Sequence, residues 1–196
     1  FVMHWRKGSG IETMPPKYDW NGKTVNAGWV KTLNEYAVIS ENRLTRIPQD
    51  TDKYVAALFG CAVTTGFGVV VNDAEIKIGD SVCVYGAGGV GLNIIQAAAL
   101  SSAYPIIAVD IYDNRLKLAQ EMGATHVINS GKEKVAEKIN EIIKDSQLDI
   151  FIDNTGVPEI IEYGYNTIKS TGKLILVCVP KKGNNISIYS FLAIES

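Results

Sequence analysis

The chain has 196 residues, a hydrophobic content of 46%, a charged content of 20% and a formal net charge of −2, which suits one full domain and part of another. The absence of a basic block argues against a nucleic-acid partner. No apolar run reaches the roughly 18 residues of a membrane span, and no signal peptide is visible. The three cysteines are far apart and odd in number, which argues against a disulfide framework. We therefore expect a cytoplasmic globular protein.

The first 50 residues predict turns and short extended runs without a core of their own. Turn signals occur at Lys7–Gly10, Pro15-Pro16 and Asn21-Gly22. The run Glu35–Ser40 contains Tyr, Val and Ile and predicts a strand. His4 has no acidic or cysteine neighbour at ligand spacing, so we expect it to be structural.

Two helices are expected next. Thr51-Asp52 is a typical helix start because an acidic residue suits the positive pole of a helix. The small-residue segment Gly60–Gly68 leads into a second expected helix, Val69–Ala74. Taken alone, Cys61 would be a small buried hydrophobe.

The stretch Ser81–Asp110 is the most informative part of the sequence. An apolar strand, Ser81–Tyr85, runs into the turn Gly86–Gly91, which is followed by an Ala- and Leu-rich helix to Leu100 and a second apolar strand, Ile106–Val109. The turn, Gly-Ala-Gly-Gly-Val-Gly, fits the G-x-G-x-x-G pattern of a dinucleotide-binding β-α-β unit.

Each part of this unit has a physical role. Gly86 permits a tight turn, Gly88 lets the backbone approach a pyrophosphate, and Gly91 allows helix and sheet to pack closely. The helix N-terminus then offers unpaired N–H groups and a partial positive charge to the phosphates. Asp110 follows Gly91 by nineteen residues, close to the roughly 20 expected of a carboxylate that binds a ribose diol.

The acid indicates NAD in preference to NADP, because a carboxylate repels a 2′-phosphate by about 1 kcal/mol or more at close range. Arg115 softens that preference. Two alternatives stay open at this point: a glycine-rich turn without a ligand, and a site for S-adenosylmethionine, since methyltransferases also place a glycine turn and a ribose-binding acid on such a unit.

Strands and helices alternate through the rest of the chain. The expected elements are a helix Asp113–Met122, a strand His126–Ile128, a helix Lys132–Lys144, a strand Leu148–Ile152, a helix from Pro158 and a strand Lys173–Val179. This order predicts an α/β fold with a doubly wound parallel sheet.

Ligands of such sheets bind at the carboxyl ends of the strands. That rule brings Gly86–Gly91, Asp110, Asp153–Gly156 and Val177–Pro180 to one edge. Asp153 either belongs to this edge or only caps the following helix.

The sequence resembles the zinc-dependent medium-chain alcohol dehydrogenases, which include polyol and threonine dehydrogenases. The resemblance rests on GCAVTTGFG, GAGGVG, IAVD, LAQEMGATHVIN and LVCVP, in this order and at family-like spacing from about Glu35 to the end. The segment NEYAVISENRLTRIP is similar to the last strands of the family's GroES-like catalytic domain.

The resemblance implies a role for individual residues. Cys61 matches a ligand of catalytic zinc, and Thr65 matches a residue beside the nicotinamide. The remaining implied cofactor residues are Gly86, Gly88, Gly89, Val90 and Gly91 at the pyrophosphate, Asp110 and Arg115 at the adenosine ribose, Asn154 and Thr155 after the fourth strand, and Val177 and Val179 at the carboxamide. Cys178 stands where many members have Gly.

The implied organisation is the end of a GroES-like catalytic domain in residues 1–58 and an NAD-binding Rossmann domain, lacking its last strand, in residues 59–196. The implied chemistry is hydride transfer between an alcohol and NAD, with zinc as Lewis acid. We expect the two other zinc ligands to lie before Phe1, and HWRKGSGIE to take the place of the family's four-cysteine zinc lobe. The chain alone is thus expected to bind NAD without turnover.

The substrate class stays open among polyols, simple alcohols, amino alcohols and sugar derivatives. A homodimer or homotetramer is expected of the full-length protein, and the sheet edge that the missing last strand would leave exposed favours association. The alternative function is a non-catalytic NAD(H)-binding or interaction module, and a methyltransferase is a more distant one.

Overall fold

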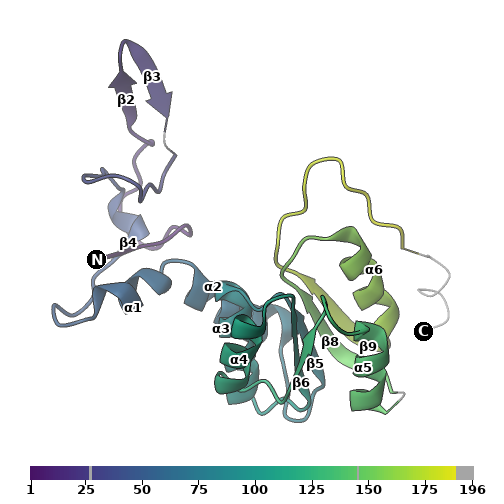
Figure 1. The fold of residues 1–196 in the computed structure, drawn as a ribbon. Coiled ribbons are helices and arrows are strands. Elements are labelled where there is room, and N and C mark those ends of the chain that lie inside the picture. Colours follow the sequence, from purple (N-terminus) through teal and green to yellow (C-terminus); the bar gives the residue numbers. More distant parts are fainter. Residues whose placement is uncertain (27, 145, 189–196) are drawn as a thin grey trace. The chain divides into compact units, whose positions relative to one another are not determined.

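The computed structural model describes residues 1–26, 28–144 and 146–188, and the chain divides into two compact units, Phe1–Thr64 and Thr65–Ser196 (Figure 1). No helix in the described ranges is long and apolar enough to cross a membrane.

The first unit contains short strands and little apolar core. Strand β1 (Val2–Met3) pairs antiparallel with β4 (Leu44–Thr45), and β2 (Lys17–Trp20) pairs with β3 (Lys23–Asn26) in a hairpin. The hairpin turns at Asn21-Gly22, as its turn signal predicts, and both residues have positive φ. Among the described residues of this unit, Ala56 is the single apolar residue that is buried. Helix α1 (Lys53–Leu58) begins as expected, since Asp52 accepts hydrogen bonds from Tyr54 N and Val55 N.

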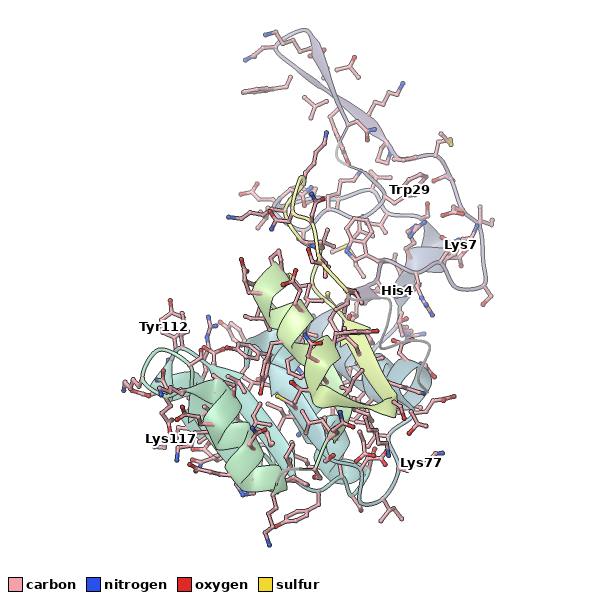
Figure 2. The ribbon with its side chains drawn as sticks, turned by 90° about the vertical axis from the view of Figure 1, so that its right-hand side faces the viewer. His4, Lys7, Trp29, Lys77, Tyr112 and Lys117 are labelled. Atoms are coloured by element: carbon pink, nitrogen blue, oxygen red, sulfur yellow. The ribbon has the colours of Figure 1, made fainter. Side chains whose placement is uncertain are left out.

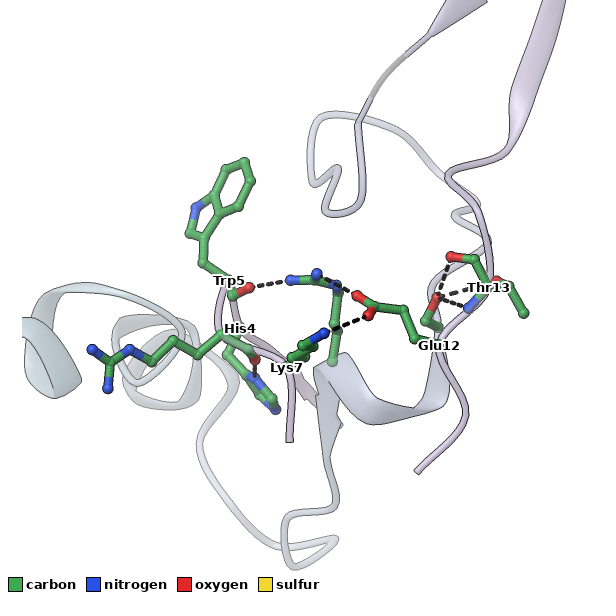
Figure 3. A network of polar contacts seen from close by, with 8 residues as sticks. His4, Trp5, Lys7, Glu12 and Thr13 are labelled. Carbon is green, nitrogen blue, oxygen red and sulfur yellow. Dashed lines mark hydrogen bonds and ion pairs between the residues drawn. The ribbon is translucent and has the colours of Figure 1, made fainter. Parts of the chain in front are cut away.

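A polar network holds the segment that follows β1 (Figure 3). The Arg43 guanidinium donates to the Trp5 carbonyl and, at 2.6 Å, to Glu12 Oε1, while Lys7 Nζ lies 3.3 Å from Glu12 Oε2. The hydrogen bond from Arg43 holds the pKa of Glu12 below its ordinary value. Ser40 Oγ accepts from Thr13 N at 3.1 Å. Hydrogen bonds and ion pairs therefore order this segment where the unit has few buried apolar side chains.

The expected strand over Glu35–Ser40 was wrong. Residues 36–40 have no regular structure, and a 3₁₀ turn, Glu41–Arg43, follows. Tyr36 is 90% exposed and Val38 63% exposed. A run of β-forming residues needs a neighbouring strand to bond its backbone, and none pairs with it in the described residues.

The second unit is built on a parallel sheet with the strand order β7-β6-β5-β8-β9 in its described part. The strands are β5 (Val82–Tyr85), β6 (Ile106–Asp110), β7 (His126–Asn129), β8 (Leu148–Asp153) and β9 (Ile168–Leu176). The connecting helices are α3 (Gly89–Leu100), α4 (Asp113–Glu121), α5 (Val135–Ile143) and α6 (Pro158–Thr167). The predicted doubly wound α/β fold is confirmed.

Apolar side chains cover both faces of this sheet. Figure 1 shows α3 and α4 on one face and α5 and α6 on the other. Val82 and Val84 belong to the apolar cluster beneath α3, whereas Cys83 belongs to the cluster beneath α5 and α6, and all three are 0% exposed. Alternate residues of β5 thus bury opposite faces, which explains its uninterrupted apolar run.

The carboxyl and amino ends of the strands lie apart. Lys77 precedes β5, and Tyr112 follows β6, so the two residues mark opposite ends of the sheet; Figure 2 shows their side chains well separated. The strand order reverses beside β5, because successive connections lead first toward β6 and then, from β7, across to β8. The carboxyl end of β5 is therefore the switch point where such sheets bind ligands.

Two expected elements have different bounds. The second helix does not begin at Val69: α2 (Ala62–Gly68) runs into a π-helical segment, Val69–Ala74. The last strand begins at Ile168 and ends at Leu176 rather than spanning Lys173–Val179. Leu148 pairs with Ile168 and Ile150 pairs with Lys173, so the residues of β9 between Ile168 and Lys173 form a bulge. The strand ends level with β8, since Leu176, its last residue, pairs with Asp153, the last residue of β8.

Candidate functional site

The turn between β5 and α3 has the tight geometry that its glycines predict. Gly86 has φ +99°, a left-handed conformation that favours glycine. A Cβ on Gly91 would lie 1.9 Å from the Gly86 carbonyl oxygen, so the first turn of α3 closes directly over the end of β5. A Cβ on Gly88 would meet no protein atom within 4 Å. Gly86 and Gly91 are thus required by the fold itself, whereas Gly88 faces open space.

Asp110 lies at the carboxyl end of β6 beside this turn. Its carboxylate is only 4% exposed, and Oδ2 accepts a hydrogen bond from Ala87 N at 2.8 Å. Oδ1 accepts from Tyr112 N at 3.0 Å. Arg115 Nη1 lies 3.5 Å from Oδ2, and the guanidinium lies 4.8 Å from the centre of the Tyr112 ring. The predicted ribose-binding acid therefore also ties β6 to the glycine turn.

The neighbouring loop after β7 adds polar contacts on the other side of β6. Ser130 N donates to the Asp110 carbonyl at 3.1 Å. Asn129 Nδ2 donates to Asp113 Oδ1 at 2.6 Å, and Lys132 binds the other oxygen of the same carboxylate. The hydrogen bond from Lys132, followed by that from Asn129, lowers the pKa of Asp113. This cluster joins the start of α4 to the loop after β7.

The loop after β8 lies on the other side of the turn. Asp153 is 0% exposed, and its carboxylate accepts from Thr155 N, Thr155 Oγ1 and Gly156 N at 3.0, 2.6 and 2.9 Å. It does not cap α6, whose N-cap is Val157 without a side-chain hydrogen bond. The capping alternative was therefore wrong. An Asp that is followed by Thr and Gly is typical of side chains that bond their own loop backbone, a signal that was available in the sequence.

Asn154 connects this loop to the glycine turn. Its backbone N–H donates to the Tyr85 carbonyl at 2.9 Å, and its side-chain Nδ2 donates to the Gly86 carbonyl at 3.3 Å. A Cβ on Gly86 would lie 3.1 Å from the Thr155 methyl group. Asn154 and Thr155, both expected at the cofactor, are thus in place beside the turn.

The segment after β9 completes this edge. Val177 N donates to the Asp153 carbonyl at 2.9 Å. A Cβ on Gly156 would lie 3.3 Å from Cys178 Sγ, from the Val179 carbonyl oxygen and from Pro180 Cα. The loop after β8 therefore has the glycine turn on one side and the segment 177–180 on the other, so the structure brings together the residues that the strand-end rule selects.

Cys61 and Thr65 lie in different units. Cys61 is exposed and, together with His4, lines a cavity of about 930 Å³ within the first unit. The His4 ring Nδ1 lies 2.5 Å from the Arg6 carbonyl oxygen. Thr65 begins the second unit, within α2. Two residues on, Phe67 packs against the apolar cluster beneath α3.

The described residues do not fit a catalytic zinc ion. Such a site needs three protein ligands and an open position. Within 1–26, 28–144 and 146–188, no three His, Cys, Asp or Glu side chains are grouped closely enough to hold a metal ion. Cys61 supplies one suitable sulfur, which falls short of the three protein ligands that such a site needs.

The same residues do fit a dinucleotide. The open space at Gly88 would be filled by any side chain, and it lies at the N-terminus of α3, whose first-turn N–H groups suit a pyrophosphate. Asp110 supplies the buried carboxylate at the end of the next strand. Hydrogen bonds within the protein hold the turn, the helix terminus and the acid together.

Comparison with known proteins shows which family the chain resembles. The family model described as "Zinc-binding dehydrogenase" matches residues 89–195. S-(hydroxymethyl)glutathione dehydrogenase of Saccharomyces cerevisiae is 34% identical over 82% of this chain and 43% of its own length. The protein of that name from Escherichia coli O1:K1 / APEC is 32% identical over 95% of this chain and 52% of its own length.

A solved structure agrees with these relatives. Benzyl alcohol dehydrogenase from Acinetobacter calcoaceticus superposes with a TM-score of 0.74 at 33% identity, over 80% of this chain and 43% of that one. The chain spans about half the length of the curated relatives that it matches, or less. The family model alone covers more than half of the chain, and the expected resemblance is confirmed: this chain belongs to the zinc-binding dehydrogenases.

Proposed function

We propose that this chain is the NAD-binding portion of a zinc-dependent alcohol or polyol dehydrogenase. The observation that carries the proposal is the glycine turn, in which Gly86 and Gly91 are required by the protein's own packing while Gly88 faces open space. A turn that served only the fold would not need glycine at Gly88, because its φ of −77° and ψ of −169° suit any residue. A closely approaching ligand explains why a side chain is missing there.

The proposed roles follow the strand ends. The pyrophosphate lies against the turn, with Gly86, Gly88, Gly89, Val90 and Gly91 contributing backbone. Asp110 accepts hydrogen bonds from the adenosine ribose, with Arg115 beside it. Asn154 and Thr155 lie at the middle of the cofactor, and Thr65, Val177 and Val179 lie toward its nicotinamide. We assign residues 1–58 to the catalytic domain and residues 59–196 to the cofactor-binding domain.

In the whole protein we propose an oxidation of small-molecule alcohols, with Cys61 as one ligand of zinc. Bound NAD supplies the hydride acceptor for that chemistry. The residues of this chain bind and orient the cofactor. The apolar core beneath the glycine turn excludes water from the side of the turn that faces the sheet. We also propose a cytoplasmic homodimer or homotetramer.

The proposal is tested by replacing Gly88 with alanine. Overpacking by one methyl group costs about 1–3 kcal/mol, so we expect the affinity for NADH to fall about 5- to 150-fold, measured by NADH fluorescence titration. Thermal unfolding of the ligand-free variant should be unchanged. Gly68→Ala is the matched control, because its Cβ would meet only Asn72 Nδ2 at 3.8 Å.

Two results would count against the proposal. Wild-type protein without a saturable NADH response at millimolar cofactor would exclude NAD binding by this chain. A Gly88→Ala variant that binds NADH like wild type would show that the open space at Gly88 is not where the cofactor lies.

A further inference from the structure

We propose that Asn154 is a positioning residue, which holds the first peptide of the glycine turn in the orientation that accepts a pyrophosphate. This inference rests on the proposed function and adds to it a role that is exerted through the protein, not through the ligand. It concerns a single peptide group, the one that joins Gly86 to Ala87.

That peptide is held at both of its ends. The Gly86 carbonyl accepts the Asn154 side-chain amide at 3.3 Å, and the Ala87 N–H donates to Asp110 Oδ2 at 2.8 Å. A peptide group is planar, so these two bonds together fix its rotation about the chain direction. One bond comes from the end of β8 and the other from the end of β6, the two strands that flank β5.

The conformation of Gly86 itself restrains the rotation of this peptide only weakly. Gly86 adopts φ +99°, and glycine populates both signs of φ readily. Removal of one side-chain partner would leave the peptide with a single hydrogen bond and the packing of Gly91 against the Gly86 carbonyl, so its N–H would be exposed to exchange more often. The direction of this peptide also sets the course of the chain into Gly88.

Asn154 is well placed for this task because its own backbone is fixed. Its N–H donates to the Tyr85 carbonyl at 2.9 Å, which continues the pairing of β5 with β8. The Asp153 carboxylate then holds the next two residues through three hydrogen bonds. The side-chain amide therefore extends from a rigid base toward the Gly86 carbonyl.

The test compares Asn154→Ala with Asn166→Ala in the 196-residue chain. Asn166 is the matched control, because its amide also donates to a backbone carbonyl, that of Glu162 at 2.9 Å, but on the exposed surface of α6. One hydrogen bond is worth about a 2- to 12-fold change. We expect Asn154→Ala to speed amide hydrogen exchange at Ala87 by about that factor in the ligand-free protein, and to weaken NADH binding similarly. Adenosine, which has no pyrophosphate, should bind Asn154→Ala and wild type equally.

Each other outcome overturns the inference. Equal exchange at Ala87 in the two variants, with weaker NADH binding in Asn154→Ala, would show direct contact with the cofactor instead of positioning. Equal loss of adenosine and NADH would show general damage to the site. If wild type binds no NADH, the proposed function fails, while the exchange measurement still decides whether Asn154 holds the peptide. Should Asn154→Ala fail to fold, Asn154→Ser, whose hydroxyl is too short to reach Gly86, serves in its place.

Discussion

The Asp110 carboxylate accepts a 2.8 Å hydrogen bond from the backbone N–H of Ala87, so the acid that ends β6 supports the turn that ends β5. A residue assigned to the ribose on sequence grounds is therefore also part of the protein's own structure. Substitutions at Asp110 will change more than cofactor preference.

Asp110→Ala should lower both stability and affinity. It leaves a buried N–H without an acceptor, which costs about 1–3 kcal/mol in the free energy of unfolding. In the proposed binding mode the ribose hydroxyls donate to this charged carboxylate, and loss of these hydrogen bonds should weaken NADH binding about 10- to 150-fold. Urea unfolding and fluorescence titration measure the two effects. Glu121→Ala, which removes an exposed acid at the end of α4, is the control. Unchanged stability in Asp110→Ala would contradict the support role.

Gly91→Ala should disrupt the turn even without cofactor. Its Cβ would lie 1.9 Å from the Gly86 carbonyl oxygen, a backbone atom that cannot move aside alone. We expect a loss of about 3 kcal/mol or more in the free energy of unfolding. Thermal and urea unfolding test this, with Gly88→Ala as the contrasting variant that keeps wild-type stability. Equal stability of the two variants would contradict the assignment of different roles to these glycines.

Asp149 predicts a pH-dependent contribution to stability. Burial acts to raise the pKa of Asp149, but hydrogen bonds from Lys169 and from Ser81 outweigh it and hold the pKa below its ordinary value. Its Oδ2 accepts from Ser81 N at 2.8 Å and from Ser81 Oγ at 2.7 Å, at the amino ends of β5 and β8. Because the folded state lowers this pKa, the stabilisation is present above the unfolded pKa of about 3.9 and is lost as the pH falls below it.

Asp149→Asn should therefore be less stable than wild type by a constant amount between pH 6 and pH 8, and the difference should shrink below about pH 4. Urea unfolding at several pH values measures it. A difference that stays constant down to pH 3 would show that the ionised carboxylate is not what stabilises this contact.

The cysteines should differ in reactivity. Cys83 is 0% exposed, and burial raises the pKa of its thiol, so we expect no reaction with a thiol reagent until the protein unfolds. Cys178 is partly exposed and Cys61 is exposed, so both should react in the native state. If the segment 177–180 lies at the nicotinamide, NADH should slow the modification of Cys178 and leave that of Cys61 less affected. Peptide mapping by mass spectrometry identifies each site. Native modification of Cys83 would contradict the packing of β5.

The β5-turn-α3-β6 unit could be predicted from sequence because its signals are local. An apolar run, spaced glycines and a terminal acid lie within thirty residues, and the observed strand ends differ from the expected ones by one residue at most. Turn chemistry at Asn21-Gly22 and the cap at Asp52 were equally local. Each depends on the residues themselves and on their immediate neighbours.

The errors concern elements that depend on distant partners. The start of β9 at Ile168 is set by pairing with Leu148 and by the bulge that follows. The run Glu35–Ser40 carries the composition of a strand but finds no pairing strand in the described residues. The link from Asn154 to Gly86 joins residues that are 68 positions apart, and periodicity within either segment contains no sign of it.

Because β5 lies in the middle of the sheet, the two sides of the cofactor site are synthesised at different times. β5 pairs with β6, which follows soon after it, and with β8, which includes Asp153. A nascent chain that has emerged only as far as α5 has the glycine turn and Asp110 but lacks the whole β8 side of the site. Long-range pairing of this kind forms late, so we expect the chain to acquire affinity for its cofactor only after the loop at Asn154 has left the ribosome.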